Sequence, residues 1–335
     1  MYRTLLALVL ALTISVADAA GLLNTQAVES AAFTEKLPSK EVESPLTVKV
    51  EVLLDRAHFS PGEIDGKLGE NVEKAITAYS EAHGLTAGGN LTGELWAMLS
   101  ADTRPVLTAY VLTENDLKGP FLKKIPAKLE DMKGLKAIRY RNVREALAEK
   151  FHMSERLLAV LNPQSKFNRA GEKIVAPNVI AHETGETKRS VAKIEVDKQR
   201  QTVKAYSQSG DLLAFYPATV GSEEKPTPDG TLKIISIDAN PTYRYNPEYK
   251  FRGVKSKKAF VIGPGPNNPV GNEWIGLSKE GYGIHGTPEP SKVSKAESHG
   301  CIRLTNWDAV QLASMVKKGV PVEFENSQAK GSHQL

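Results

Sequence analysis

The spacing of apolar residues changes along the chain and separates a helical region from a strand-rich one. Between residues 45 and 102 the spacing is mostly helical, and Asn71 is the predicted cap of one helix. Residues 91–99 predict another short helix, whereas residues 46–54 fit both an alternating strand and one face of a helix. The clearest helical set in this region is Val72, Ala75, Ile76 and Tyr79.

From residue 191 onward, apolar residues alternate with charged ones, which predicts strands. The exception is residues 307–318, which predict a helix capped by Asn306. A last strand is predicted at residues 320–324. The pattern therefore predicts a mainly-β, β-sandwich-like domain with one clear helix.

Residues 103–188 have a less regular pattern and predict an α+β connector. Residues 106–112 favour a strand, and residues 118–136 are basic and predicted to be exposed. From residue 143 there are helical apolar stretches, then a turn and a last strand. A helical connector without a ligand is the alternative.

The first residues have the composition of an export signal. Arg3 precedes an apolar run, and Ala17-Asp18-Ala19 forms a small-x-small cleavage site. The run is too short for a transmembrane helix, although an uncleaved anchor is the alternative. No cysteine lies at the cleavage site, which excludes a lipoprotein anchor, and no later segment predicts a membrane span.

Composition adds two restrictions. The net charge of +4 is spread along the chain, which argues against a nucleic-acid partner. Cys301 is the only cysteine, which excludes an intramolecular disulfide and any site with several cysteine ligands. In an exported protein, one unpaired thiol favours a reactive role over packing.

Cys301 lies close to two histidines in glycine-rich segments, which is typical of a cysteine nucleophile with a histidine base. His285 and His299 are both candidates for the base, and Gly300 would let backbone N–H groups point at an oxyanion. A zinc site of two histidines and one cysteine is an alternative, but no fourth ligand is evident. Ordinary polar histidines are the third interpretation.

The motifs at 284–287 and 298–304 resemble the active-site signature of the L,D-transpeptidase (YkuD-type) catalytic domain, and the segment at 264–271 is similar to its Gram-negative subgroup. The resemblance implies that Cys301 is the nucleophile and His285 its base and acid. It also implies that the Gly286 carbonyl orients His285. Backbone amides around His299, Gly300 and Cys301 would form the oxyanion hole, Ser298 would shape the loop, and Arg303 would hold a substrate carboxylate or form an ion pair.

The same resemblance implies a two-step reaction on peptidoglycan. The thiol would attack a tetrapeptide stem, release D-alanine and form a thioester. A second stem would then give a 3→3 cross-link, a lipoprotein lysine an anchored lipoprotein, and water a carboxypeptidase product. A non-catalytic cell-wall binding protein is the alternative of a different class. The family implies a periplasmic enzyme of cell-wall biogenesis and cell shape, without a cofactor or metal, that carbapenems acylate.

Residues 45–102 resemble the small three-helix peptidoglycan-binding domain, with its loop at 59–69. Residues 143–178 resemble a LysM-type glycan-binding module in their helices and last strand. The predicted organisation is a signal peptide at 1–19, a linker at 20–44, the peptidoglycan-binding domain at 45–102, the connector at 103–188, the catalytic domain at 189–326 and a tail at 327–335.

Overall fold

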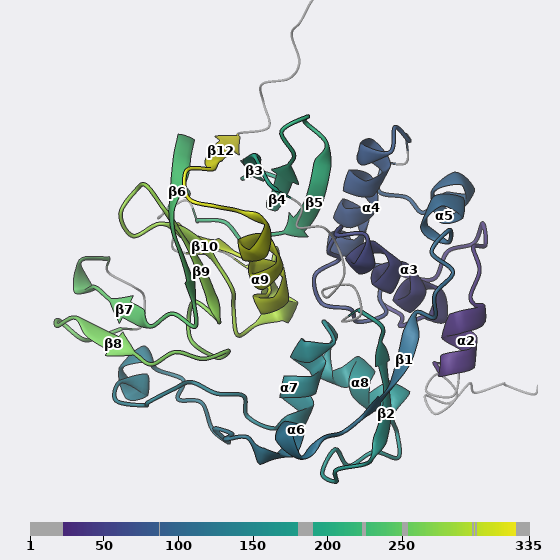
Figure 1. The fold of residues 1–335 in the computed structure, drawn as a ribbon, viewed down its shortest axis with the longest axis horizontal. Helices are drawn as coiled ribbons and strands as arrows, with labels where there is room; N and C mark the ends of the chain where they lie inside the picture. The colour runs from purple at the N-terminus through teal and green to yellow at the C-terminus, as the bar shows by residue number, and fades with distance from the viewer. Residues whose placement is uncertain are drawn as a thin grey trace, which may run out of the picture.

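The computed structural model describes residues 23–86, 88–179, 190–222, 226–249, 254–296, 298 and 300–325. The predicted signal peptide and tail lie outside the described residues. A curled sheet forms one side of the molecule, and a helical domain and a smaller α+β unit lie beside it (Figure 1). Across these described ranges, no helix has the length and apolar character needed to cross a membrane.

The helical domain begins earlier than the sequence predicts. Residues of the predicted linker form helix α2, and Val28 within it is fully buried, so the linker prediction is wrong for this stretch. The ambiguous segment at 46–54 is helical because Ser44 accepts a hydrogen bond from the Thr47 N–H (3.0 Å) and Pro45 begins the helix. The helices are α2 (Thr25–Ser30), α3 (Pro45–Arg56), α4 (Glu70–Ala82) and α5 (Gly93–Leu99).

The middle unit has three α-helices and one short 3₁₀ helix between two antiparallel strands. Its strands pair from Leu107 opposite Pro177 to Val111 opposite Lys173. The Asn162 side chain joins the helix at 155–161 to the last strand. Its Oδ1 accepts from the Val175 N–H (2.6 Å) and its Nδ2 donates to the Val175 carbonyl (2.7 Å). The elements are β1 (Leu107–Val111), α6 (Glu114–Lys118), η1 (Leu129–Met132), α7 (Val143–Lys150), α8 (Glu155–Leu161) and β2 (Lys173–Pro177).

Residues 119–138, here called the strap, leave the middle unit and cross to the far side of the catalytic domain (Figure 1). The prediction that this basic stretch is simply exposed is wrong for its apolar residues, because they complete a small separate core. Two hydrogen bonds fix its end: the Ile138 N–H donates to the Pro264 carbonyl (2.8 Å) and the Asn267 N–H to the Ile138 carbonyl (3.0 Å). The core residues are Met132, Ile138, Tyr245, Phe260 and Ile262.

The catalytic domain is one curled sheet with a helix against it, a mainly-β fold as predicted. The strand order is β11-β10-β9-β6-β12-β3-β4-β5. Strands β12 and β3 are parallel, as are β10 and β11, and the other neighbours are antiparallel. Beside this sheet, β7 and β8 form a separate hairpin. The elements are β3 (Lys193–Asp197), β4 (Thr202–Tyr206), β5 (Leu212–Pro217), β6 (Gly230–Ala239), β7 (Tyr243–Tyr245), η3 (Pro247–Tyr249), β8 (Phe260–Ile262), β9 (Glu273–Leu277), β10 (Gly283–His285), η4 (Pro290–Lys292), β11 (Ile302–Arg303), α9 (Asn306–Met315) and β12 (Pro321–Glu325).

Two predicted helix caps are wrong. Helix α9 is capped by Thr305, whose side chain accepts from the Asp308 N–H (3.2 Å), so Asn306 is already in the helix. Helix α4 begins after Gly69, and Asn71 lies in its first turn. In both cases the amide side chain bonds a distant part of the chain, which local sequence does not reveal.

The helical domain docks onto the free edge of the catalytic sheet. The Ser60 N–H donates to the Phe215 carbonyl, and the Phe215 N–H to the His58 carbonyl (both 2.9 Å), so residues 58–60 extend the sheet beyond β5. The Asn71 Nδ2 donates to the Val293 carbonyl (3.1 Å). The helical domain and the domain of the large sheet are therefore in direct contact near the segment that leads to Cys301.

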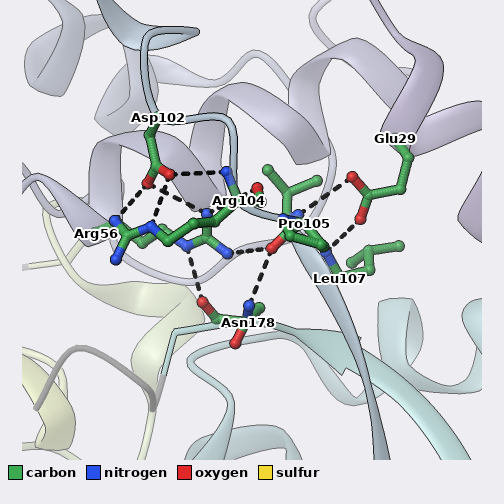
Figure 2. Close-up of polar contacts among 8 residues, drawn as sticks. Glu29, Arg56, Asp102, Arg104, Pro105, Leu107 and Asn178 are labelled. Carbon is green, nitrogen blue, oxygen red and sulfur yellow. Dashed lines mark hydrogen bonds and ion pairs between the residues drawn. The ribbon is translucent and has the colours of Figure 1, made fainter. Parts of the chain in front are cut away.

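Arg56, at the end of α3, joins the helical domain to the middle unit (Figure 2). Its guanidinium donates to the Asn178 carbonyl (2.8 Å), to Asp102 Oδ2 (3.3 Å) and to the carbonyls of Arg104 (3.3 Å) and Pro105. The side chain is 1% exposed. One buried cation therefore links acceptors from both sides of this contact.

We expect Arg56→Ala to lower the free energy of unfolding by about 3 kcal/mol, because it removes a buried guanidinium together with its four hydrogen bonds. Urea denaturation followed by circular dichroism measures this loss. Arg104→Ala is the control, since the Arg104 side chain is 56% exposed and its pair with Asp102 contributes under about 1 kcal/mol. Equal losses in the two variants would contradict this assignment.

Candidate active site

Two adjacent parallel strands place His285 and Cys301 on one face of the sheet. Ile284 pairs with Ile302, and His285 with Arg303. Because side chains alternate along a strand and paired residues share a face, Cys301, Arg303 and His285 all project to the side opposite the buried isoleucines. Cys301 and His285 line the same cavity. The structure thus brings the predicted nucleophile and base together.

His285 is held in one tautomer. Its Nδ1 lies 2.6 Å from the Gly286 carbonyl, which can only accept, so Nδ1 carries the proton and Nε2 keeps a free lone pair. The ring is 3% exposed and stacks on Trp274 of β9, with centroids 5.5 Å apart. The pKa of His285 is lowered to about 3, mainly by burial and also by the nearby Arg303 charge, while the Gly286 bond partly opposes the shift. The imidazole is therefore neutral and able to accept a proton at neutral pH.

The Cys301 thiol is a protonated nucleophile in its resting state. Its Sγ lies 3.5 Å from the Gly281 carbonyl. Burial raises the pKa of the thiol, and the Gly283 N–H and Arg303 only partly oppose this. A neutral thiol beside a neutral imidazole requires that the proton be removed as the sulfur attacks.

Because both groups are neutral, we expect the rate of acylation by meropenem to stay constant between about pH 5 and 8. A histidine with its usual pKa of about 6.5 would instead lose base activity as the pH falls through that value. Stopped-flow fluorescence measures the rate, and a small free thiol serves as the control, since its thiolate fraction rises about tenfold per pH unit. A fall in the enzyme rate centred near pH 6.5 would contradict the neutral pair.

The loop before Cys301 is organised by Ser298, which is buried. Its N–H donates to the Val220 carbonyl (2.8 Å), its Oγ donates to the Cys301 carbonyl, and it accepts from the Gly300 N–H (3.2 Å). Gly300 has a φ of +102°, and a Cβ there would lie 2.9 Å from the Tyr282 ring. Since the Gly300 N–H is engaged by Ser298, a predicted oxyanion hole would rely first on the Cys301 N–H. His299 lies outside the described residues.

Arg303 faces the cavity and is a candidate for anion binding. Its backbone exchanges two hydrogen bonds with Thr219 (both 2.9 Å), which fixes its position beside Cys301. Among the described residues its guanidinium has no ion pair, so the predicted loop-holding ion pair is not observed there. Burial lowers the pKa of Arg303, while the charges of Cys301 and Glu289 raise it.

The sequence interpretation missed Asn306 as a residue of the site. A Cβ added to Gly286 would lie 2.1 Å from the Asn306 Oδ1, and one added to Gly271 would lie 2.0 Å from it. The Asn306 amide therefore packs against the backbone of both glycines. The Asn306 Nδ2 donates to Glu149 Oε1 of the middle unit (2.8 Å). Only the tertiary packing reveals this link, because the four residues are far apart in sequence.

The site opens into a cavity of about 1780 Å³ whose walls come from every part of the described chain. The catalytic domain provides the reactive face. The strap, the middle unit and the loop of the helical domain form the remaining walls. Representative lining residues are Trp274, His285, Cys301 and Arg303 of the catalytic domain, Lys123 and Lys124 of the strap, Glu145 and Glu149 of α7, and Glu63 of the helical domain.

The catalytic and helical domains both match known families. The L,D-transpeptidase catalytic domain (YkuD) matches residues 192–324, and a peptidoglycan-binding domain matches residues 43–99. A Bacillus licheniformis protein named as the L,D-transpeptidase YkuD is 31% identical over 182 residues, which cover 54% of this chain and 92% of the relative. The probable L,D-transpeptidase YbiS of Escherichia coli is 28% identical over 144 residues, 42% of this chain and 46% of the relative. A solved L,D-transpeptidase from Mycobacterium smegmatis is 22% identical with a TM-score of 0.34, covering 46% of this chain and 63% of the other.

The chain belongs to the L,D-transpeptidase family and carries a peptidoglycan-binding domain ahead of the catalytic domain. Membership supports an enzyme that acts on peptidoglycan. The matched region spans nearly all of the Bacillus licheniformis relative but about half of the Escherichia coli one. The LysM-like segment at 143–178 has no match among these families and stays a prediction.

Proposed function

We propose that the protein is an L,D-transpeptidase that works through a thioester on Cys301. The observation that carries this proposal is the shared face of Cys301 and His285, with His285 Nδ1 held on the Gly286 carbonyl. This arrangement leaves Nε2 as the base beside a thiol in a large cavity. The zinc alternative has less support, because among the described residues no third metal-binding side chain groups with His285 and Cys301.

In the first step, His285 Nε2 takes the Cys301 proton as the sulfur attacks the carbonyl carbon of the third stem residue, a diamino acid. The tetrahedral intermediate collapses, the C–N bond breaks, and D-alanine leaves with that proton. In the second step an acceptor amine attacks the thioester and gives a proton to His285. The sulfur leaves as a thiol, and an amide has formed.

The remaining site residues have supporting roles in this proposal. The Cys301 N–H would be the first donor to the oxyanion, and the segment of His299 and Gly300 would complete the hole if the Gly300 N–H leaves Ser298 Oγ. Ser298 would hold that loop in place. Arg303 would bind a stem-peptide carboxylate, since its fork suits bidentate recognition and no ion pair occupies it among the described residues. No cofactor is required, because the thiol and the imidazole supply the nucleophile and the proton transfers.

We place the enzyme outside the cytoplasm, where the substrate of its family lies, and propose the periplasm of a Gram-negative bacterium. This rests on the predicted signal peptide at 1–19 and the similarity of segment 264–271 to that subgroup. The domain limits predicted above, with the peptidoglycan-binding domain at 45–102 and the catalytic domain at 189–326, are part of the proposal. Helices α7 and α8, followed by strand β2, support a LysM-like module at 143–178 in the middle unit.

The acceptor decides the product. A diamino acid of another stem gives a 3→3 cross-link, a lipoprotein lysine gives an anchored lipoprotein, and water gives a tripeptide. The second candidate, a non-catalytic wall-binding protein, has only the peptidoglycan-binding domain in its favour and does not explain the held tautomer of His285.

The decisive experiment incubates the purified protein with disaccharide-tetrapeptide and identifies the products by mass spectrometry. A 3→3 dimer with released D-alanine supports the transpeptidase. Tripeptide alone indicates the carboxypeptidase, and addition of a lipoprotein with a free lysine tests anchoring. Unchanged substrate together with no covalent meropenem adduct would overturn the enzyme assignment in favour of the wall-binding protein.

A further inference from the structure

The peptidoglycan-binding domain contributes a side chain to the catalytic cavity. Glu63 belongs to the loop between α3 and α4, yet it lines the same cavity as Cys301 and His285. A family resemblance assigns this loop to a separate binding domain. Its contact with the catalytic cavity follows only from the way the domains pack.

The loop that carries Glu63 is held from two other parts of the chain. The Ile64 N–H donates to the His152 carbonyl (2.9 Å), and the Ser154 N–H donates to the Ile64 carbonyl (3.0 Å), so the middle unit fixes one side. Ser60 Oγ donates to Asp308 Oδ2 at the start of α9 (2.9 Å), which fixes the other side. These bonds hold the Glu63 backbone in place before any ligand arrives, which favours binding.

The Glu63 carboxyl is a half-buried acid without a direct partner in the part of the chain that the structure describes. Within the described residues it makes no hydrogen bond or ion pair, although the side chain is half-buried. The pKa of Glu63 is raised to about 7, mainly by burial and also by the charges of Asp65 and Glu155, while the charge of Lys295 lowers it. Lys295 lies in the segment that precedes Cys301, so a charge of that segment acts on the Glu63 carboxyl. An unpaired, partly desolvated carboxylate gains most from a cation that enters the cavity.

We propose that Glu63 binds the ammonium group of the diamino acid of a stem peptide and is a specificity-determining residue of the transpeptidase. The inference rests on the proposed function, which supplies the stem peptide as the ligand. The ligand class is a primary ammonium group on a peptide. This group occurs both in the donor stem, which acylates Cys301, and in the acceptor stem, which resolves the thioester.

Binding is measured first on the Cys301→Ala protein, where no reaction consumes the peptide. Isothermal titration compares disaccharide-tetrapeptide with the same peptide acetylated on its side-chain amine. We expect Glu63→Gln to weaken binding of the free amine about tenfold and to leave the acetylated peptide bound as by the parent. Glu94→Gln, the same charge change at an exposed site of the same domain, is the control and should match the parent.

Two kinetic measurements on the enzyme with Cys301 intact then separate the donor from the acceptor. If Glu63 binds the donor, Glu63→Gln raises the KM for D-alanine release from the free-amine tetrapeptide and not from the acetylated one. If Glu63 binds the acceptor, the test uses an acetylated tetrapeptide as donor and a tripeptide with a free amine as acceptor. The ratio of dimer to hydrolysis product should then be about tenfold lower for Glu63→Gln than for the parent enzyme. Parent-like binding and kinetics of Glu63→Gln with the free amine would overturn the proposal. The titration needs no turnover, so failure of the transpeptidase reaction itself would appear separately, as absent D-alanine release by the protein with an intact Cys301.

Discussion

Cys301→Ala is expected to reduce D-alanine release from disaccharide-tetrapeptide by at least about 10⁴-fold, because loss of a nucleophile removes the whole covalent pathway. The effect should exceed that of any other single substitution in the site. Neither imidazole nor water in the cavity can replace the thioester step. The rate is measured by coupling released D-alanine to an amino-acid oxidase.

The same variant offers a direct chemical control. Cys301 is the only cysteine in the chain, so a thiol adduct has one possible location. Meropenem should add its full mass to the unchanged protein once, since ring opening retains every atom, and should add nothing to Cys301→Ala. An adduct on the alanine variant would place the nucleophile elsewhere.

Gly286→Ala is expected to lower the acylation rate about 100-fold, because it displaces the carbonyl that holds His285. The new Cβ would lie 2.1 Å from Asn306 Oδ1 and 3.2 Å from the Asn306 Cα, so the backbone or the amide must move. Overpacking of this kind also costs about 1–3 kcal/mol of stability. Stopped-flow acylation by meropenem and urea denaturation measure the two effects.

Gly93→Ala is the matched control, because its new Cβ would make only ordinary contacts with Phe33, at 3.6 Å or more. The double variant Gly286→Ala with Asn306→Ala tests the cause. Removing the Asn306 amide should restore part of the lost stability, as expected for two residues in contact. Additive losses in the double variant would show that the clash with Asn306 is not the origin of the effect.

The site could be predicted from the sequence to the extent that its residues are close along the chain. Cys301, Ser298 and Gly300 lie in one loop, and the glycine-rich surroundings of His285 are enough to make it a candidate base. The shared face of His285 and Cys301 comes from the pairing of two strands. Asn306 and Glu63 could not be predicted as parts of the site, because their roles depend on contacts with residues more than ten positions away.

The fold shows the same division. The alternation after residue 191 correctly predicted a mainly-β domain with one helix, since burial of one face of a strand imposes a period of two. The stretch at 25–30 of the predicted linker and the basic stretch at 118–136 were misjudged. A short helix such as α2, or a strap with few apolar residues, is stabilised by a core that other segments provide, and its own pattern is too weak to show it.

By itself the sequence determined the candidates for the proposed chemistry: a lone thiol, a nearby histidine as its base, and the glycines around both. It also determined the two domain families, because their motifs are contiguous. The tertiary structure decided which carbonyl holds the base, that both reactive groups are neutral, and that the peptidoglycan-binding domain forms part of the catalytic cavity. The physical reason is that burial and long-range packing set pKa values and cavity walls, and neither quantity is encoded in local spacing.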